Sequence, residues 1–437
     1  MIARIVKRLW YYYLRASVYL TSRGYYRKVE VNGMGNVPRT GALLLGVRHS
    51  NALMDPLMTG AFVPRVLHFL VRADVFASPF ARWLWGTMNM MPIYRLHDGR
   101  NKMGRNQKTF NRCFHLLQKG HCIEIFPEGG HSAKQKLEPL KKGAARIVIG
   151  ALENMTDTDV HVLPVGLNYS DERAFRAKLS VNVGPPISGR QYFNAEDPLA
   201  PVALTKLTKA LETGIRPQVL DLRKPAPYSE MNAIRQILEN HVHGVRLPQF
   251  AFSKQLTESL VNASGKDETR ERLLALEKEH AALHKKLRLP LPGLPAKPIS
   301  TGSIWGKLLL NLIFILVFPL GILLHAPMLI PASRAHRLVK DPIFYSALRF
   351  IAGMFLTQIL YLIYFLVVAL VLETWGSVFV FMAGLVLSGV LALRGYDALR
   401  DISQLLKIRG IVQDHPADAQ RLRTLQKEMQ ALIVEQA

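Results

Sequence analysis

A hydrophobic region in the last third of the chain limits its possible folds most strongly. Phe350–Leu372 is long, uncharged and free of proline. About 20 apolar residues are enough to cross a bilayer as a helix, so this segment is predicted to span a membrane. Val378–Leu393 is long enough only if it is counted from Trp375. Leu308–Ile330 is also apolar, but it contains helix-breaking residues and one polar residue, namely Pro319, Gly321, Pro327 and His325.

The charges between these segments predict their topology. The loop 332–349 is basic, and so is the tail that begins at Arg394, whereas the loop 373–377 has no basic residue. If all three segments crossed, both basic stretches would lie opposite the amino-terminal part, against the positive-inside tendency. We therefore predict that Leu308–Ile330 is a re-entrant segment covered by protein. The other two segments would then cross fully, with the amino-terminal part in the cytoplasm.

Residues 28–222 alternate between strand-like and helix-like patterns. Such alternation predicts an α/β domain, a mixed sheet flanked by helices, with functional loops at the strand ends. The predicted strands are Lys28–Val31, Ala42–Val47, Val66–Val71, Met91–Tyr94, Cys122–Phe126, His161–Leu167 and Leu179–Val183. The predicted helices are Pro56–Phe62, Pro79–Met88, Gln107–Gln118, Gly143–Glu153 and Leu204–Val219.

Composition divides the rest of the chain. Residues 1–27 repeat apolar and aromatic residues at helical spacing among basic ones, which is typical of an amphipathic helix at a membrane interface; a helix packed on its own domain explains the pattern equally well. Residues 223–298 are predicted to be a helical segment ending in a Pro-rich linker. Residues 299–396 form the predicted membrane region, and residues 397–437 form a helical tail in the cytoplasm.

The charge balance restricts the partners. The chain has 56 Lys and Arg against 32 Asp and Glu, a formal net charge of +24. A basic surface suits nucleic acid, anionic lipid or anionic substrates. The apolar segments favour an anionic phospholipid membrane, and no zinc spacing, RNA-recognition signature or basic zipper favours nucleic acid. The two cysteines form no disulfide framework, and neither a metal nor a cofactor is predicted.

His49 and Asp55 suggest general-base chemistry. Both follow the predicted strand Ala42–Val47. A positioned histidine can take a proton from a hydroxyl, and a carboxylate can orient its ring. Residues six apart do not share a helix face, so the pair can meet only if Ser50–Met54 is a loop. Asp55 before Pro56 also fits a helix cap, and in that case His49 would be an ordinary residue at a strand end.

A second polar segment follows the strand Cys122–Phe126. Glu128 is a polar group at the strand end, and Gly129 and Gly130 permit close backbone approach. Ser132 and the basic residues from Lys134 onward come next. The basic residues could hold phosphate, and Arg95 is a further phosphate candidate. The alternative is a solvated basic loop.

Four blocks of this sequence resemble the glycerolipid acyltransferases of the lysophosphatidate acyltransferase type. The blocks are His49…Asp55, Pro92–Arg95, Phe126–Gly129 with Ser132, and Val162–Tyr169, and the resemblance covers residues 1–220. It implies that His49 is the base, that Asp55 is its partner, and that Glu128 and Gly129 help to bind the acceptor. It also implies direct transfer from a thioester, without an acyl-enzyme or a metal.

Two positions depart from the family pattern. Five residues separate His49 from Asp55 where the family has four, a spacing found in its glycerol-phosphate branch. Gly130 and His131 stand where many members have Thr-Arg. Because a histidine carries no permanent charge, the anion contact of that arginine is expected to move to Arg95 or Lys134.

The resemblance therefore implies a membrane-bound O-acyltransferase. Its donor would be acyl-CoA or acyl carrier protein, and its acceptor glycerol 3-phosphate or 1-acylglycerol 3-phosphate. The expected location is a bacterial inner membrane. Two alternatives stay open: an acyltransferase for another lysolipid, and a non-catalytic lipid-binding scaffold. A transporter is disfavoured, because the spans lack intramembrane acidic residues beyond Glu373 at an edge.

Overall fold

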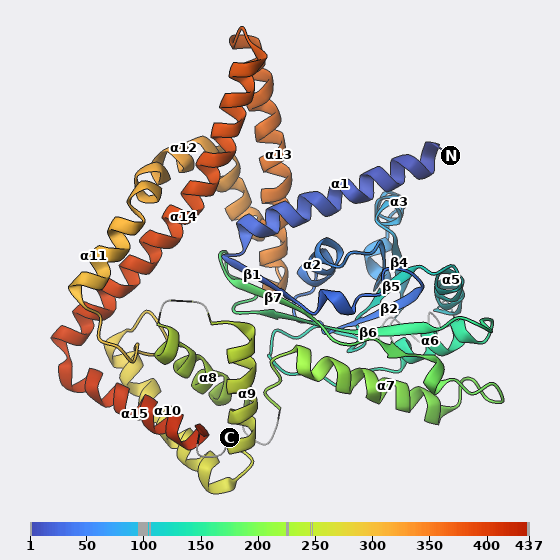
Figure 1. The fold of residues 1–437 in the computed structure, drawn as a ribbon, viewed down its shortest axis with the longest axis horizontal. Helices are drawn as coiled ribbons and strands as arrows, with labels where there is room; N and C mark the ends of the chain where they lie inside the picture. Colours follow the sequence, from blue (N-terminus) through green and yellow to red (C-terminus); the bar gives the residue numbers. More distant parts are fainter. Residues whose placement is uncertain are drawn as a thin grey trace. The chain divides into compact units, whose positions relative to one another are not determined.

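The computed structural model describes residues 2–94, 104, 106–223, 227–244, 246 and 248–434. The chain forms two compact units (Figure 1). The first unit comprises Met1–Arg23, Val29–Arg173 and Ala177–Leu220. The second unit comprises Gly24–Lys28, Ala174–Arg176 and Asp221–Ala437.

The first unit is built on an eight-stranded mixed sheet. Its strand order is β1-β7-β6-β2-β5-β3-β4, and β8 pairs with β6. Strands β2 to β6 run parallel to their neighbours within this group, whereas β7 and β8 are antiparallel to β6. The bounds are β1 Lys28–Asn32, β2 Ala42–Val47, β3 Leu67–Arg72, β4 Met90–Ile93, β5 Cys122–Ile125, β6 Val160–Tyr169, β7 Lys178–Val183 and β8 Ile187–Ser188.

Helices cover both faces of the sheet, as predicted. On one face α5 (Asn106–Gln118), α6 (Gly143–Leu152) and α7 (Pro201–Ile215) contribute Leu117, Ile147 and Leu211 to a core with alternate residues of β2, β5 and β6. The other face carries α1 (Ile2–Tyr25) and α2 (Met54–Phe62). There the Thr59 hydroxyl donates to the buried Glu124 of β5 at 2.6 Å. Every residue of β2 is buried, as expected for a strand enclosed on both faces.

The predicted elements of this unit are present, and their ends differ by a few residues. Helix α7 ends earlier than predicted, because Pro217 lies in the 3-10 turn Arg216–Gln218 and cannot continue an α-helix. Helix α3 is Pro79–Thr87, and the Ser78 side chain caps it. The short strand β8 was not predicted.

The start of α2 corrects one prediction. The helix begins at Met54 with Leu53 at the cap position, so Asp55 lies inside the first turn and does not cap the helix. The physical reason is that the Asp55 carboxylate accepts hydrogen bonds from the loop that precedes the helix. The Asp55 carboxylate therefore does not accept from the amides of the first helical turn, and α2 has no side-chain cap.

Helix α1 packs on its own unit and also exposes apolar residues. The Tyr11 hydroxyl accepts a hydrogen bond from the Leu67 amide at 3.0 Å, and the Tyr19 ring contacts Phe62. Leu9 and Leu20 are 64% and 69% exposed. The helix therefore packs on its own unit, and its position at a membrane interface stays a prediction.

The second unit is helical within its described residues. Helices α8 (Tyr228–His243), α9 (Phe250–Ala263), α10 (Asp267–Leu287) and α15 (Pro416–Val434) surround a core that includes Ile234, Leu260 and Met429. The helices α11 (Thr301–Leu310), α12 (Leu312–Arg334), α13 (Tyr345–Val371) and α14 (Trp375–Asp414) form a second group (Figure 1).

Three segments of this unit are long and apolar enough to cross a membrane: Leu312–Leu338, Pro342–Val371 and Trp375–Asp414. Their apolar side chains are widely exposed, with Leu370 at 88%, which fits a lipid environment. Helix α12 continues through Pro319, Pro327 and Pro331. It contacts α13 through a hydrogen bond of 3.0 Å between His325 Nε2 and the Tyr361 hydroxyl. The re-entrant course of this segment stays a prediction.

Candidate active site

His49 and Asp55 meet at the carboxyl end of β2. The strand ends at Val47, and the chain then turns through a short loop before α2 begins at Met54. This loop brings His49 Nδ1 to 2.9 Å from Asp55 Oδ2. The pair thus has the geometry of a histidine oriented by a carboxylate; its catalytic role stays a prediction.

Asp55 is buried, and both of its carboxylate oxygens are hydrogen-bonded. Oδ2 accepts from the backbone amides of Ser50 at 2.7 Å and Asn51 at 2.8 Å. Oδ1 accepts from the Tyr169 hydroxyl at 2.8 Å. Several donors around one carboxylate compensate its burial and fix its orientation. The sequence block Val162–Tyr169 assigned no role to Tyr169, and only this contact shows that its hydroxyl supports Asp55.

The imidazole of His49 lies between two aromatic rings. It stacks on Phe126 with 4.0 Å between ring centroids, and the His131 ring meets it edge-on at 5.6 Å. Its side chain is 13% exposed. With Nδ1 bound to Asp55, Nε2 is the nitrogen left for proton transfer, and within the described part of the chain no residue hydrogen-bonds it.

Contacts between the two loops hold the candidate site together. Strands β2 and β5 are parallel neighbours, so the loops that follow them emerge at the same sheet edge. The His49 carbonyl accepts from the Ser132 amide at 3.0 Å. The Arg48 guanidinium is buried and donates to the carbonyls of Ser132 and Lys134. Arg48 is a positioning residue that the sequence analysis did not single out.

Glu128 also links the loops. Its Oε1 accepts from the His49 amide at 2.7 Å, and its Oε2 accepts from the Glu138 amide at 3.0 Å. Burial raises the pKa of this carboxyl, and these amides with the Arg48 charge oppose that rise. Glu128 therefore positions the His49 backbone, in addition to any contact with an acceptor.

Replacing Glu128 by glutamine is expected to lower kcat more than it raises KM for the acceptor. The amide NH2 of glutamine would face a backbone N–H, so one of the two loop contacts is lost and His49 shifts. We expect kcat to fall about tenfold or more, which corresponds to the free energy of one charge-assisted hydrogen bond. Steady-state kinetics would measure this. A large rise in KM with unchanged kcat would instead indicate direct acceptor binding. Glu138→Gln is the matched control, because only the backbone of Glu138 contacts Glu128.

Four of the other predicted binding residues lie in the loop after β5. Gly129 has φ +72°, and its amide donates to the Phe126 carbonyl at 3.1 Å, a turn that a residue with a side chain would strain. Gly130 is exposed, with open space where a Cβ would stand. Ser132 Oγ accepts from the Lys134 amide at 3.3 Å, and Lys134 is exposed. Arg95 lies outside the described residues.

A second carboxyl lies near the pair. The Glu172 carbonyl accepts from Asn51 Nδ2 at 2.8 Å. The pKa of its side chain is raised to about 7, mainly by burial; the negative charges of Asp171 and Asp55 add to the rise, and Arg48 opposes it.

Glu172→Gln is expected to raise the stability of the protein at pH 8 but not at pH 4. In the unfolded chain this carboxyl has its ordinary pKa near 4.3. Between about pH 4.3 and 7 the folded protein binds more protons than the unfolded one, so the free energy of unfolding falls as pH rises. Glutamine removes that loss, which is on the order of 3–4 kcal/mol above pH 7. Thermal unfolding at both pH values measures it. Exposed Glu196→Gln should change neither midpoint, and equal effects of the two variants would refute the assignment.

The described residues contain no group of three or more His, Cys, Asp and Glu side chains arranged to hold a metal. Cys113 and Cys122 are free and buried. Burial raises the pKa of Cys113 to about 12, so this thiol is a packing residue and not a nucleophile.

Residues 28–168 match the family model described as Acyltransferase. This match confirms, for that part of the chain, the resemblance inferred from the sequence blocks. The chain is 38% identical over 79 residues to glycerol-3-phosphate O-acyltransferase 1 of Saccharomyces cerevisiae, a match covering 18% of this chain and 10% of that protein. It is 27% identical over 140 residues to a chloroplastic 1-acyl-sn-glycerol-3-phosphate acyltransferase of Brassica napus, covering 32% and 37%.

Among solved structures, the 1-acyl-sn-glycerophosphate acyltransferase of Thermotoga maritima matches with a TM-score of 0.35 and 18% identity. That match covers 48% of this chain and 82% of the other. The chain thus spans about a tenth of the yeast relative and over a third of the plant relative.

Proposed function

We propose that the protein is a membrane-bound O-acyltransferase that moves a fatty acyl group from acyl-CoA or acyl carrier protein to a glycerol-phosphate acceptor. The contact of 2.9 Å between His49 and Asp55 carries this proposal, because it lies within the segment that matches the Acyltransferase family. The Glu128–Lys134 loop beside it offers a backbone turn and basic side chains for a phosphate-bearing substrate.

In the proposed reaction, His49 Nε2 takes the proton of the acceptor hydroxyl as its oxygen attacks the thioester carbonyl carbon. A C–O bond forms and a tetrahedral oxyanion results. When it collapses, the C–S bond breaks, and the proton on His49 passes to the leaving thiolate. The Asp55 carboxylate stabilises the imidazolium while it exists. The acyl group goes directly to the acceptor, without an acyl-enzyme.

The acceptor is proposed to be glycerol 3-phosphate or 1-acylglycerol 3-phosphate. The two relatives described above bear names with these two compounds. Gly129, Gly130, Ser132 and Lys134 are proposed to contact it, and Arg95 is proposed to bind its phosphate together with Lys134. His131, which replaces the usual arginine, lies edge-on to His49 and cannot provide a permanent charge.

Membrane attachment is part of the proposal. The three apolar segments and the exposed Leu9 and Leu20 of α1 support it. We propose two crossings with one re-entrant segment, and the acyltransferase domain on the cytoplasmic side of a bacterial inner membrane.

The proposal is tested with the full chain in lipid nanodiscs. Acyl-CoA or acyl carrier protein is supplied with glycerol 3-phosphate or 1-acylglycerol 3-phosphate, and thiol release and the acylated product are measured. Product formation with either acceptor is expected. Stoichiometric binding of lysolipid without thiol release from any donor would overturn the proposal in favour of a lipid-binding scaffold.

A further inference from the structure

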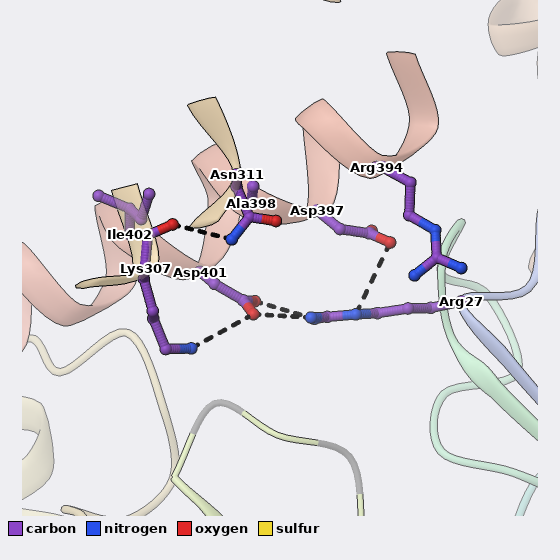
Figure 2. Close-up of a pocket in the computed structure, with 8 residues that line it drawn as sticks. All are labelled: Arg27, Lys307, Asn311, Arg394, Asp397, Ala398, Asp401 and Ile402. Carbon is purple, nitrogen blue, oxygen red and sulfur yellow. Dashed lines mark hydrogen bonds and ion pairs between the residues drawn. The ribbon is translucent and has the colours of Figure 1, made fainter. Parts of the chain in front are cut away.

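A charged pocket lies within the second unit, on residues that the proposed chemistry does not use. It has a volume of about 170 Å³ and is lined mainly by polar side chains (Figure 2). A water takes about 30 Å³ of liquid, so the pocket has room for several waters or one phosphate group. Its lining residues are Arg27, Lys307, Asn311, Arg394, Asp397 and Asp401, with two apolar neighbours.

The ion pairs around the pocket leave positive charge uncompensated. Asp401 is paired with Arg27, whose two terminal nitrogens lie 2.9 and 2.7 Å from its carboxylate oxygens. Asp397 is paired with Arg176, whose Nε lies 3.0 Å from Oδ1. Each buried aspartate thus already has an arginine. The four cations thus exceed the two carboxylates by two charges: Lys307 shares Asp401 with Arg27 at the longer distance of 3.9 Å, and Arg394 is the fourth.

Arg394 is the side chain most available to a ligand. It makes no hydrogen bond or ion pair with any residue in the described part of the chain, and it is exposed. Figure 2 shows its guanidinium directed toward Arg27, with no dashed line to either aspartate. Two excess cations match a phosphomonoester, which carries about −1.5 to −2 charges at pH 7. A guanidinium also binds phosphate oxygens in a bidentate manner.

The pocket stands at the ends of two candidate membrane spans. Helix α12 begins directly after Asn311, and the apolar stretch of α14 ends directly before Arg394. The two helices touch at this level, because a Cβ on Gly395 would lie 2.4 Å from the Phe314 carbonyl oxygen. Trp305 of α11 is 58% exposed, and tryptophan is typical of the membrane interface. The end of a membrane span is the level at which lipid headgroups lie.

From these observations we infer that the pocket binds the phosphate of an anionic lipid, with Arg394 and Lys307 as its principal ligands. A phosphomonoester headgroup fits the excess charge best. A soluble phosphomonoester has the same chemistry, and the experiment separates the two sources. The inference goes beyond the proposed acyl transfer and relies only on its membrane-bound state.

The test counts bound ligands by native mass spectrometry on the delipidated full chain, titrated with dioctanoyl phosphatidate, dioctanoyl phosphatidylcholine or glycerol 3-phosphate. We expect Arg394→Gln and Lys307→Gln to bind one phosphatidate fewer than the wild type at equal concentration, with affinity at this site lowered about tenfold or more. Arg394→Lys keeps the charge but not the bidentate geometry, so it should bind phosphatidate more tightly than Arg394→Gln and less tightly than the wild type. Arg400→Gln, the same charge change on α14 outside the pocket, should bind like the wild type.

The outcomes separate the possible sources. If Arg394→Gln and Lys307→Gln lose one bound phosphatidate, and binding of glycerol 3-phosphate does not depend on Arg394, the site is assigned to a lipid headgroup. Arg394-dependent binding of glycerol 3-phosphate assigns it to a soluble phosphomonoester and overturns the lipid source. Equal binding by Arg394→Gln and Arg400→Gln overturns the site itself. Any phosphatidate bound at the first unit should stay bound in every variant. The test can therefore be interpreted even if the protein shows no acyltransferase activity.

Discussion

Replacing His49 by alanine is expected to lower kcat/KM for acyl transfer by about 10²–10⁴-fold, the usual contribution of a positioned general base. The acceptor hydroxyl would then have to lose its proton to water. The stability of the protein should change little, because the side chain contributes one hydrogen bond, to Asp55, and two ring contacts, with Phe126 and His131. Thiol release measured with saturating donor would report the loss.

His161→Ala is the matched control. That histidine lies on β6, and its side chain is 41% exposed, so its loss should leave turnover within about twofold. His49→Gln adds a second comparison, since glutamine keeps a polar side chain of similar length without a titratable nitrogen. Full activity in both His49 variants would show that another group is the base.

Asp55→Asn is the second change with a large expected effect, about 10³–10⁴-fold in kcat, as for the orienting aspartate of hydrolytic triads. An asparagine cannot stabilise an imidazolium. Its carbonyl oxygen can still accept from the amides of Ser50 and Asn51 that now bind Oδ2, but without the negative charge. The ring of His49 would be held less firmly. Kinetics and thermal unfolding should be measured on the same preparation.

Tyr169→Phe provides the graded control, because it removes the hydroxyl that donates the hydrogen bond of 2.8 Å to Asp55 Oδ1. We expect a loss of about 1 kcal/mol in stability and a fall in kcat of about tenfold or less. If Asp55 served only to hold its loop, Asp55→Asn would lower the unfolding midpoint while the remaining folded enzyme kept the wild-type kcat. That result would remove Asp55 from the mechanism.

Local patterns explain why so much of the fold could be predicted. A buried strand such as Ala42–Val47 and an amphipathic helix such as Gln107–Gln118 are encoded by the spacing of their own apolar residues. The same holds for the apolar stretch Phe350–Leu372. The candidate pair was recognisable because His49 and Asp55 are close in sequence and lie at a strand end. Cap positions were less predictable, since Asp55 bonds to the preceding loop and not to the helix start.

The sequence by itself thus determined the α/β alternation, the apolar segments and the identity of the candidate catalytic pair, His49 and Asp55. Only the tertiary structure decided which distant groups support them. Glu128 reaches His49 across 79 residues and Tyr169 reaches Asp55 across 114, and Arg176 pairs with Asp397 across 221. Such contacts depend on the order of strands and on helix packing. These are set by the burial of the whole core, which no local spacing of residues records.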